Sequence, residues 1–323
     1  MKKLNHTVFT GGKFSACILI FIMVYFIILN GCKKDSPIKD TSDCIPIPPY
    51  NQVGFGYDYI TEPCIFRRPF FNPNNDNEFL YVTTCAGVTN IMKYNLLDKS
   101  KTQIWSGAPW SRPRWGKKDF ILFGRNDANI YRIKSNGDSL TQLTSLGNIH
   151  HPNWNINGDK FLAFTEASNL YSFIFDLNGN LIDTIDFGFT NECTFQNPNY
   201  IVSNNSDNVM FYNLNTNSIE YQIDYSYLNS NGGGSIFWLN NSEVIFSHTN
   251  GLNKLSIPSL KNHNFKNSCN SKQYSTGDIN SSKTKMIWAS SNLKYVNNST
   301  LIFKSRINIM NVDGSDEQEI DLN

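Results

Sequence analysis

The sequence has little charge. Asp, Glu, Lys and Arg make up 17% of its 323 residues and the formal net charge is +1, whereas about 25% charged residues is usual for globular chains. A nearly neutral chain has no long-range field that would attract nucleic acid or an anionic membrane surface. We therefore expect no nucleic-acid partner.

Several signatures of enzymes and cofactor sites are also missing. The chain has no CxxC pair, no GxSxG sequence and no glycine-rich phosphate loop ahead of a helix. These absences argue against the common zinc sites, the nucleophile elbow of α/β-hydrolases and P-loop nucleotide binding. Helical periodicity with caps is absent as well. We expect an all-β chain without a metal or a cofactor.

Apolar residues, by contrast, are plentiful. Hydrophobic residues make up 40% of the chain and aromatic residues 14%, which is enough to build a sizeable core. Much of the polar remainder is Asn, Ser and Thr, which favour turns over helix interiors.

The N-terminal residues predict export. Lysines precede an uncharged stretch of sixteen residues, Phe14 to Leu29, which as a helix would span roughly 24 Å, short of the ~30 Å hydrocarbon core. A basic segment followed by a short apolar one is typical of a signal peptide, which we assign to residues 1–31. An uncleaved anchor that ends at Lys33 and Lys34 is the alternative.

The sequence "LNGC", Leu29 to Cys32, resembles the lipobox of bacterial lipoproteins. The resemblance implies that Cys32 becomes a lipid-bearing N-terminus and that the protein is anchored to a membrane of the bacterial cell envelope. Residues 32–51 contain Pro37, Pro46, Pro48 and Pro49 and no apolar periodicity. We interpret them as a partly stiffened tether.

Seven cysteines are present, of which Cys17 lies in the signal peptide and Cys32 is the lipidation site. Those that remain are Cys44, Cys64, Cys85, Cys193 and Cys269. Five is an odd number, so at least one is unpaired. Cys64 and Cys85 flank the first predicted strand region, and an oxidising compartment would permit them to pair. Small buried apolar residues are the alternative interpretation for most of them.

The rest of the chain repeats. A large apolar residue followed by a short apolar run recurs at intervals of 44, 39, 41, 42 and 42 residues. These six anchors are Phe71, Trp115, Trp154, Phe195, Phe237 and Ile279. Further short alternating runs follow each anchor, separated by turn pairs such as Asn136-Gly137 and Asp313-Gly314, which tolerate the positive φ of tight hairpins.

A unit of about 40 residues with several strands has the length of one propeller blade. One such sheet cannot bury both faces, so the blades must stack around an axis with large aromatic residues between them. We therefore predict a six-bladed β-propeller of four-stranded antiparallel blades over residues 52–323. Trp154 is expected to pack between blades.

The sequence "HPNWNINGDKFLAF" is similar to the "PxWSPDGxxIAF" repeat of TolB-type β-propellers. The segments "NIYRIKSNGDSLTQLT" and "INIMNVDGSDEQEI" resemble the part that follows it in that family. TolB itself carries an α/β domain ahead of its propeller, for which no room exists here. We do not expect the family's Tol–Pal role.

Candidate catalytic and metal sites have structural interpretations. Adjacent strand residues point to opposite faces, so His150 and His151 do not readily share a metal. Ser235 follows three glycines without a strand-turn-helix context, and we expect it in a loose loop between blades. The run Asn72 to Glu78 lacks the frame of an EF-hand, and we expect a solvated hairpin turn.

The function that we predict is a non-catalytic module that binds a protein or a glycan of the envelope at its axial rim. The residues assigned to this rim are Arg68, Arg112, His151, Glu192 and Asp278. A carbohydrate-active hydrolase or lyase at the same rim is the alternative, which would need convergent carboxylates. A purely structural envelope protein is a third class.

The sequence allows two ways of completing the last blade and so closing the ring. The C-terminal strand completes the last blade alone, or the segment Gln52 to Ile60 adds a strand to it.

Overall fold

The structure is a computed structural model that describes residues 58–323, except 166–170, 188, 190–191, 205–207, 225–232, 249, 270, 298–299 and 323. The predicted signal peptide, the tether and Cys32 lie outside the described residues, as does Cys44. In the part that is described, every regular element is a β-strand, and no helix is long and apolar enough to span a membrane.

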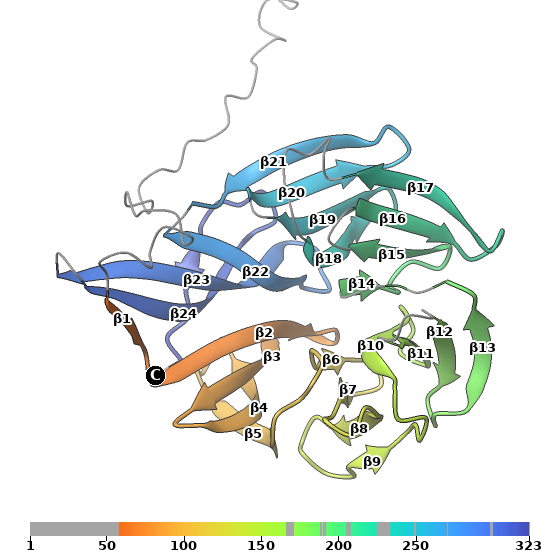
Figure 1. Cartoon of the computed structure of the whole chain (residues 1–323), viewed down its shortest axis with the longest axis horizontal. Coiled ribbons are helices and arrows are strands. Elements are labelled where there is room, and N and C mark those ends of the chain that lie inside the picture. Colours follow the sequence, from red (N-terminus) through yellow and green to blue (C-terminus); the bar gives the residue numbers. More distant parts are fainter. Residues whose placement is uncertain are drawn as a thin grey trace, which may run out of the picture. The chain divides into compact units, whose positions relative to one another are not determined.

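The strands form six sheets arranged around a common axis, as Figure 1 shows. Blade 1 contains β2 (Cys64–Asn72), β3 (Asn75–Cys85), β4 (Val88–Asn95) and β5 (Lys101–Ser106). Blade 2 contains β6 (Arg114–Trp115), β7 (Phe120–Gly124), β8 (Ile130–Lys134) and β9 (Thr141–Gln142). Blade 3 contains β10 (His150–Trp154), β11 (Lys160–Phe164), β12 (Ser172–Asp176) and β13 (Leu181–Ile185).

The second half of the ring follows the same plan. Blade 4 contains β14 (Glu192–Thr194), β15 (Tyr200–Asn204), β16 (Asn208–Asn213) and β17 (Ser218–Asp224). Blade 5 contains β18 (Gly233–Asn240), β19 (Glu243–His248), β20 (Gly251–Ser256) and β21 (Lys261–Asn267). Blade 6 contains β22 (Lys272–Ile279), β23 (Lys285–Asn297), β24 (Thr300–Asn311) and β25 (Gln318–Glu319), joined by β1 (Asp58–Thr61). The prediction of six four-stranded antiparallel blades is confirmed.

The first strand of each blade lies nearest the axis. These inner strands, β2, β6, β10, β14, β18 and β22, contact one another in a closed circle. The inner strands therefore form the wall of the axial space, and residues far apart in the sequence meet there.

The predicted anchors lie in these inner strands, except Phe195, which directly follows β14. All six are buried, with at most 7% of their surface exposed. Each of the six junctions between neighbouring blades contains one apolar cluster. Trp154 packs against Leu122 and Ile130 of blade 2 and against Phe161 of its own blade, so its predicted role between blades is confirmed.

Burial of these large side chains holds the ring together. Each buried aromatic or aliphatic side chain contributes about 1.5–3 kcal/mol relative to an exposed one. The contribution exists only when the neighbouring blade is present, which explains why a single blade would not be stable.

The turn glycines behave as predicted. Gly137, Gly179 and Gly314 have φ values of 91°, 88° and 85°. Gly158, in the turn after Trp154, has a φ of 67°, and a Cβ atom there would lie 2.8 Å from the backbone nitrogen of Lys117 in blade 2. Glycine is therefore required at this position both for its backbone conformation and for the close approach of two neighbouring turns.

Both ends of the described chain close the ring in blade 6. Strand β1 pairs in parallel with the first part of β24, from Asp58–Thr300 to Thr61–Phe303, and β25 pairs with Asn308 and Ile309 further along β24. Of the two predicted solutions, the structure shows the one in which the N-terminal segment adds a strand.

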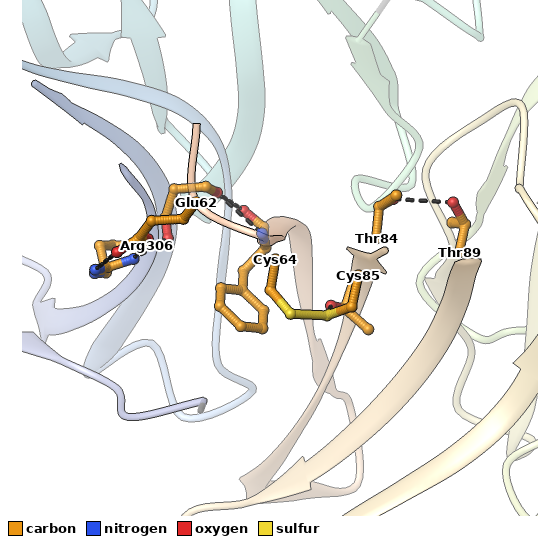
Figure 2. Close-up of a disulfide and its surroundings, with 9 residues drawn as sticks. Glu62, Cys64, Thr84, Cys85, Thr89 and Arg306 are labelled. Carbon is orange, nitrogen blue, oxygen red and sulfur yellow. Dashed lines mark hydrogen bonds and ion pairs between the residues drawn. A yellow bond between two sulfur atoms is a disulfide. The ribbon is translucent and has the colours of Figure 1, made fainter. Parts of the chain in front are cut away.

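Ion pairs reinforce this closure beside a disulfide (Figure 2). The Arg306 guanidinium binds the carboxylate of Glu62, the residue that follows β1. Nε of Arg306 lies 2.7 Å from Oε1 of Glu319 in β25. Cys64 and Cys85, opposite each other on β2 and β3, form a disulfide. Of the two interpretations that the sequence left open for these cysteines, the structure shows the disulfide.

Candidate binding pocket on the propeller axis

A pocket of about 240 Å³ lies on the axis. All six blades contribute to its wall, for example through Phe71, Arg114, Trp154, Thr194, Phe237 and Asp278. The wall continues into the turns between the first and second strands of the blades, which are called the first turns below. Exposed lining residues such as Lys117, Ile156 and Asn241 lie in these first turns, so the pocket opens on the face of the propeller that carries them.

Asp278 is the acidic group of the pocket wall. Its side chain is 8% exposed, and Oδ2 accepts a hydrogen bond of 2.9 Å from the backbone N–H of Phe71 in blade 1. Burial raises the pKa of Asp278 above its ordinary value of 3.8, and the charges of Arg112 and Arg114 partly oppose that shift. Of the predicted rim residues, Asp278 is the one that lines this pocket.

Arg112 connects four blades next to Asp278. It lies two residues before β6, is 3% exposed, and donates from Nη2 to the carbonyl oxygens of Pro69 in blade 1, at 2.6 Å, and of Gly277 in blade 6. Nη1 donates to Oγ of Ser235 in blade 5 at 2.7 Å. Arg112 was assigned to the rim, and the structure places it in the packed interior near the axis.

Ser235 lies in a buried strand and not in a loose loop, so that prediction was wrong. It belongs to β18, is fully buried, and its Oγ accepts hydrogen bonds from Arg112 and from the backbone N–H of Gly277. The run of glycines before it resembled a loop, but a residue without a large side chain also allows an inner strand to approach its neighbours closely.

Arg68 and His151 occupy equivalent positions in blades 1 and 3. Each has a positive φ, of 58° and 54°, and each sits where the pairing of the inner strand shifts register. Arg68 donates to the carbonyl oxygen of Pro109 at 3.0 Å, and the His151 ring stacks on Phe164 at 5.1 Å. Neither residue lines the axial pocket, which begins further along the inner strands.

The remaining sequence-predicted positions lie elsewhere. Glu192 begins β14 and pairs with Asn204, and its side chain lies outside what the structure describes. His150 is buried with its ring 5.8 Å from that of Trp110. Across the described residues, no group of three or more His, Cys, Asp or Glu side chains is arranged to hold a metal ion.

The hairpin turn predicted within Asn72 to Glu78 is shorter than that run: Pro73 and Asn74 form the turn between β2 and β3, and Asn75 to Glu78 begin β3. Oδ1 of Asn72 accepts from the backbone N–H of Asn74 at 2.9 Å. Asp76, at the start of β3, accepts from the backbone N–H and the hydroxyl of Ser281 in blade 6, at 2.9 and 2.7 Å. The turn therefore fixes one side of the pocket mouth.

Sequence reasoning missed the basic residues of the pocket. Arg114 directly precedes the anchor Trp115, and Lys117 follows Trp115 by two residues. Lys283 follows the anchor Ile279 by four residues. A search for charged residues beside the anchors would have found them. The anchors lie near the ends of the inner strands, so the residues that follow them in different blades lie at the same end of the axis.

No protein-family profile and no curated protein sequence matches the chain. Among solved structures, an acylaminoacyl peptidase of Pyrococcus horikoshii is similar over 80% of this chain and 52% of that chain, with 12% identity and a TM-score of 0.52. A chain of the mitotic checkpoint complex is similar over 78% of this chain and 88% of that chain, with 9% identity and a TM-score of 0.49. This chain spans about half the length of the peptidase, and the likeness shows the fold alone: the protein is a six-bladed β-propeller.

Proposed function

We propose that the protein is an exported, lipid-anchored propeller of TolB type that acts as a non-catalytic binding module of the bacterial cell envelope. The observation that carries the proposal is the axial pocket, to which all six blades contribute. Residues from several blades form one composite surface there, as is common for binding sites built on loops at the end of a rigid scaffold.

The interior of the pocket is held in place by hydrogen bonds within the protein. Nε1 of Trp154 donates to the carbonyl oxygen of Arg114 at 3.0 Å, and Nε2 of Gln196 donates to that of Trp154 at 2.8 Å. A wall fixed in this way is preorganised to receive a ligand.

Binding is favoured over hydrolysis because of the acidic groups. Glycoside hydrolysis generally uses two carboxyl groups that flank the bond to be cleaved. Among the described residues that line the pocket, Asp278 is the sole carboxylate, and its Oδ2 accepts from the protein backbone.

The proposed location rests on the lipobox-like sequence and is supported by the disulfide between Cys64 and Cys85, since disulfides persist in oxidising compartments. Metabolic labelling with a fatty-acid analogue tests it. We expect the wild-type chain to be labelled and to sediment with membranes, and the Cys32→Ala variant to lose the label. A labelled Cys32→Ala variant would contradict the proposed lipid site.

Ligand capture tests the binding role. The full chain is used to probe a glycan array and to pull down proteins from envelope extracts, beside an Ile156→Trp/Asn241→Trp variant that fills the pocket mouth. Both positions are exposed in first turns, so the variant is expected to fold normally and to lose its ligands. Unchanged capture by the filled variant would reject the pocket as the site, and turnover of a captured glycan would reject the non-catalytic role.

A further inference from the structure

We propose that the axial pocket binds a sugar that carries a carboxylate, with the ring in the pocket and the acid group at Lys117 and Lys283. This inference rests on the proposed binding function and specifies the ligand class of the same site.

The first step is the charge of the lining. The described lining residues include three cations, Arg114, Lys117 and Lys283, and one carboxylate, Asp278, which gives a formal charge of 3 − 1 = +2. The whole chain has a formal charge of only +1. The remaining residues therefore carry a formal charge of 1 − 2 = −1, so positive charge is concentrated at this pocket, and a low-dielectric wall strengthens its effect on an anion.

The second step is the position of the two lysines. Lys283 turns its ammonium group toward the pocket wall, where Nζ donates to the carbonyl oxygen of Trp238 at 2.9 Å. Burial of this group is the main cause that lowers the pKa of Lys283, and the charge of Lys117 lowers it further, while Asp278 and Asp76 act in the opposite direction. Two cations from blades 2 and 6 thus line the same pocket, and a bound anion would interact favourably with both.

The third step is the size and nature of the wall. A volume of about 240 Å³ is below the roughly 300–1,000 Å³ of sites for drug-sized ligands, so the pocket has room for about one sugar ring. Aromatic side chains from five junctions, including Phe71, Trp154 and Phe237, face it beside polar groups. A sugar ring presents C–H faces to aromatic groups and hydroxyls to polar ones.

The amide groups in the wall fit hydroxyl groups as partners. Asn153 donates its Nδ2 to the carbonyl oxygen of His151, and Gln196 donates its Nε2 to that of Trp154. With these N–H groups engaged by the protein, their amide oxygens are acceptors, which hydroxyl donors satisfy. The free end of an acidic glycan combines such hydroxyls with one carboxylate.

The test compares glucuronate with glucose, which has the same ring without the acid group, and with a short peptide that ends in Glu. Binding to the full chain is measured by calorimetry and by the fluorescence of the tryptophans that line the pocket. We expect glucuronate to bind at least tenfold more tightly than glucose, and its affinity to fall as salt is added. Equal affinity for the two sugars, or binding of the acidic peptide alone, would overturn the inference.

Substitution of the two lysines provides the second part of the test. Lys117→Gln and Lys117→Gln/Lys283→Gln are expected to weaken glucuronate binding at least tenfold. Lys118→Gln is the matched control, because Lys118 is also exposed in the same turn and does not line the pocket. Wild-type glucuronate binding by the double variant would also overturn the inference. If capture of another ligand were lost on filling the mouth while glucuronate did not bind, this inference would fail and the proposed function would stand.

Discussion

At the scale of single residues, opposite charges are enclosed near the axis. Arg112 and Asp278 are 3% and 8% exposed, and removal of water from a charge costs several kcal/mol unless partners replace it. Arg112 finds its partners in the carbonyl and hydroxyl oxygens of three other blades. The sequence showed only an arginine before an anchor, which is why a surface role was predicted for it.

Replacement of Arg112 by Met should therefore reduce the free energy of unfolding by about 3–5 kcal/mol, because Asp278 would lose a compensating charge and buried oxygens would lose their donor. Urea denaturation followed by circular dichroism measures the change. Arg68→Met serves as the comparison, since Arg68 is half-buried and would lose a bond to Pro109, at a cost of about 1 kcal/mol. Similar urea midpoints for the two variants would contradict the interior role of Arg112.

His248 should make the free energy of unfolding depend on pH in the acidic range. It is 4% exposed at the end of β19, and burial lowers its pKa from 6.5 to about 4. Below pH 6.5 the unfolded chain takes up a proton at this residue that the folded chain does not. The free energy of unfolding should therefore fall by about 1.4 kcal/mol per pH unit between pH 6.5 and 4 through this group.

The measurement is a set of urea transitions between pH 4 and 7. His248→Gln should lose less stability than the wild type over this range, while His263→Gln, a change at an exposed position, should follow the wild type. Parallel curves for the wild type and His248→Gln would show that burial of this ring does not control the acid response.

At the scale of elements, the strands and turns were largely predictable. Each junction is built from large apolar residues that recur near every 41 residues, and Asn-Gly and Asp-Gly pairs identify the hairpins. The contributions of Ser235 and of β1 (Asp58–Thr61) were harder to predict. Ser235 in blade 5 contacts Gly277 in blade 6, and β1 pairs with β24 in blade 6. The local sequence does not indicate partners that lie so far away in the chain.

Deletion of Gln52–Ile60 removes most of β1 and tests its part in closure. We expect the free energy of unfolding to fall by roughly 2–4 kcal/mol, taking about 1 kcal/mol for each hydrogen bond lost along β24. Deletion of residues 33–38, which precede this segment and contain no cysteine, is the control and should leave the urea midpoint unchanged. Equal midpoints for the two deletions would mean that β1 contributes nothing to the closed ring.

At the scale of the whole molecule, the six-fold repeat predicted the ring and its axis, but not which end of the axis holds the pocket. The predicted rim residues were chosen because they precede the anchors, and the pocket lies where the inner strands end. Two of its basic residues, Lys117 and Lys283, are 166 positions apart in the sequence and line the same pocket because blades 2 and 6 are both next to blade 1 (Figure 1).

Closure through Arg306 should stabilise the ring as one cooperative unit. Arg306→Gln removes the ion pairs to Glu62 and Glu319, and we expect a loss of about 1–2 kcal/mol, or roughly 3–6 °C in Tm. Circular dichroism and tryptophan fluorescence should report the same lowered transition, because the tryptophans are distributed over several blades. Lys294→Gln, at an exposed position of β23, is the control. Two separate transitions in Arg306→Gln would show that the blades unfold independently.

The parallel pairing of β1 with β24 has a mechanical consequence. A tensile load applied at the N-terminal end of the described chain reaches the four residue pairs of β1 first, and then the contact of Glu62 with Arg306. Only after these have yielded is the load transmitted to Cys64, the first residue of β2, and through its disulfide to Cys85 in β3 (Figure 2). Pulling from this end would therefore detach β1 from β24 before it distorted the four-stranded part of any blade.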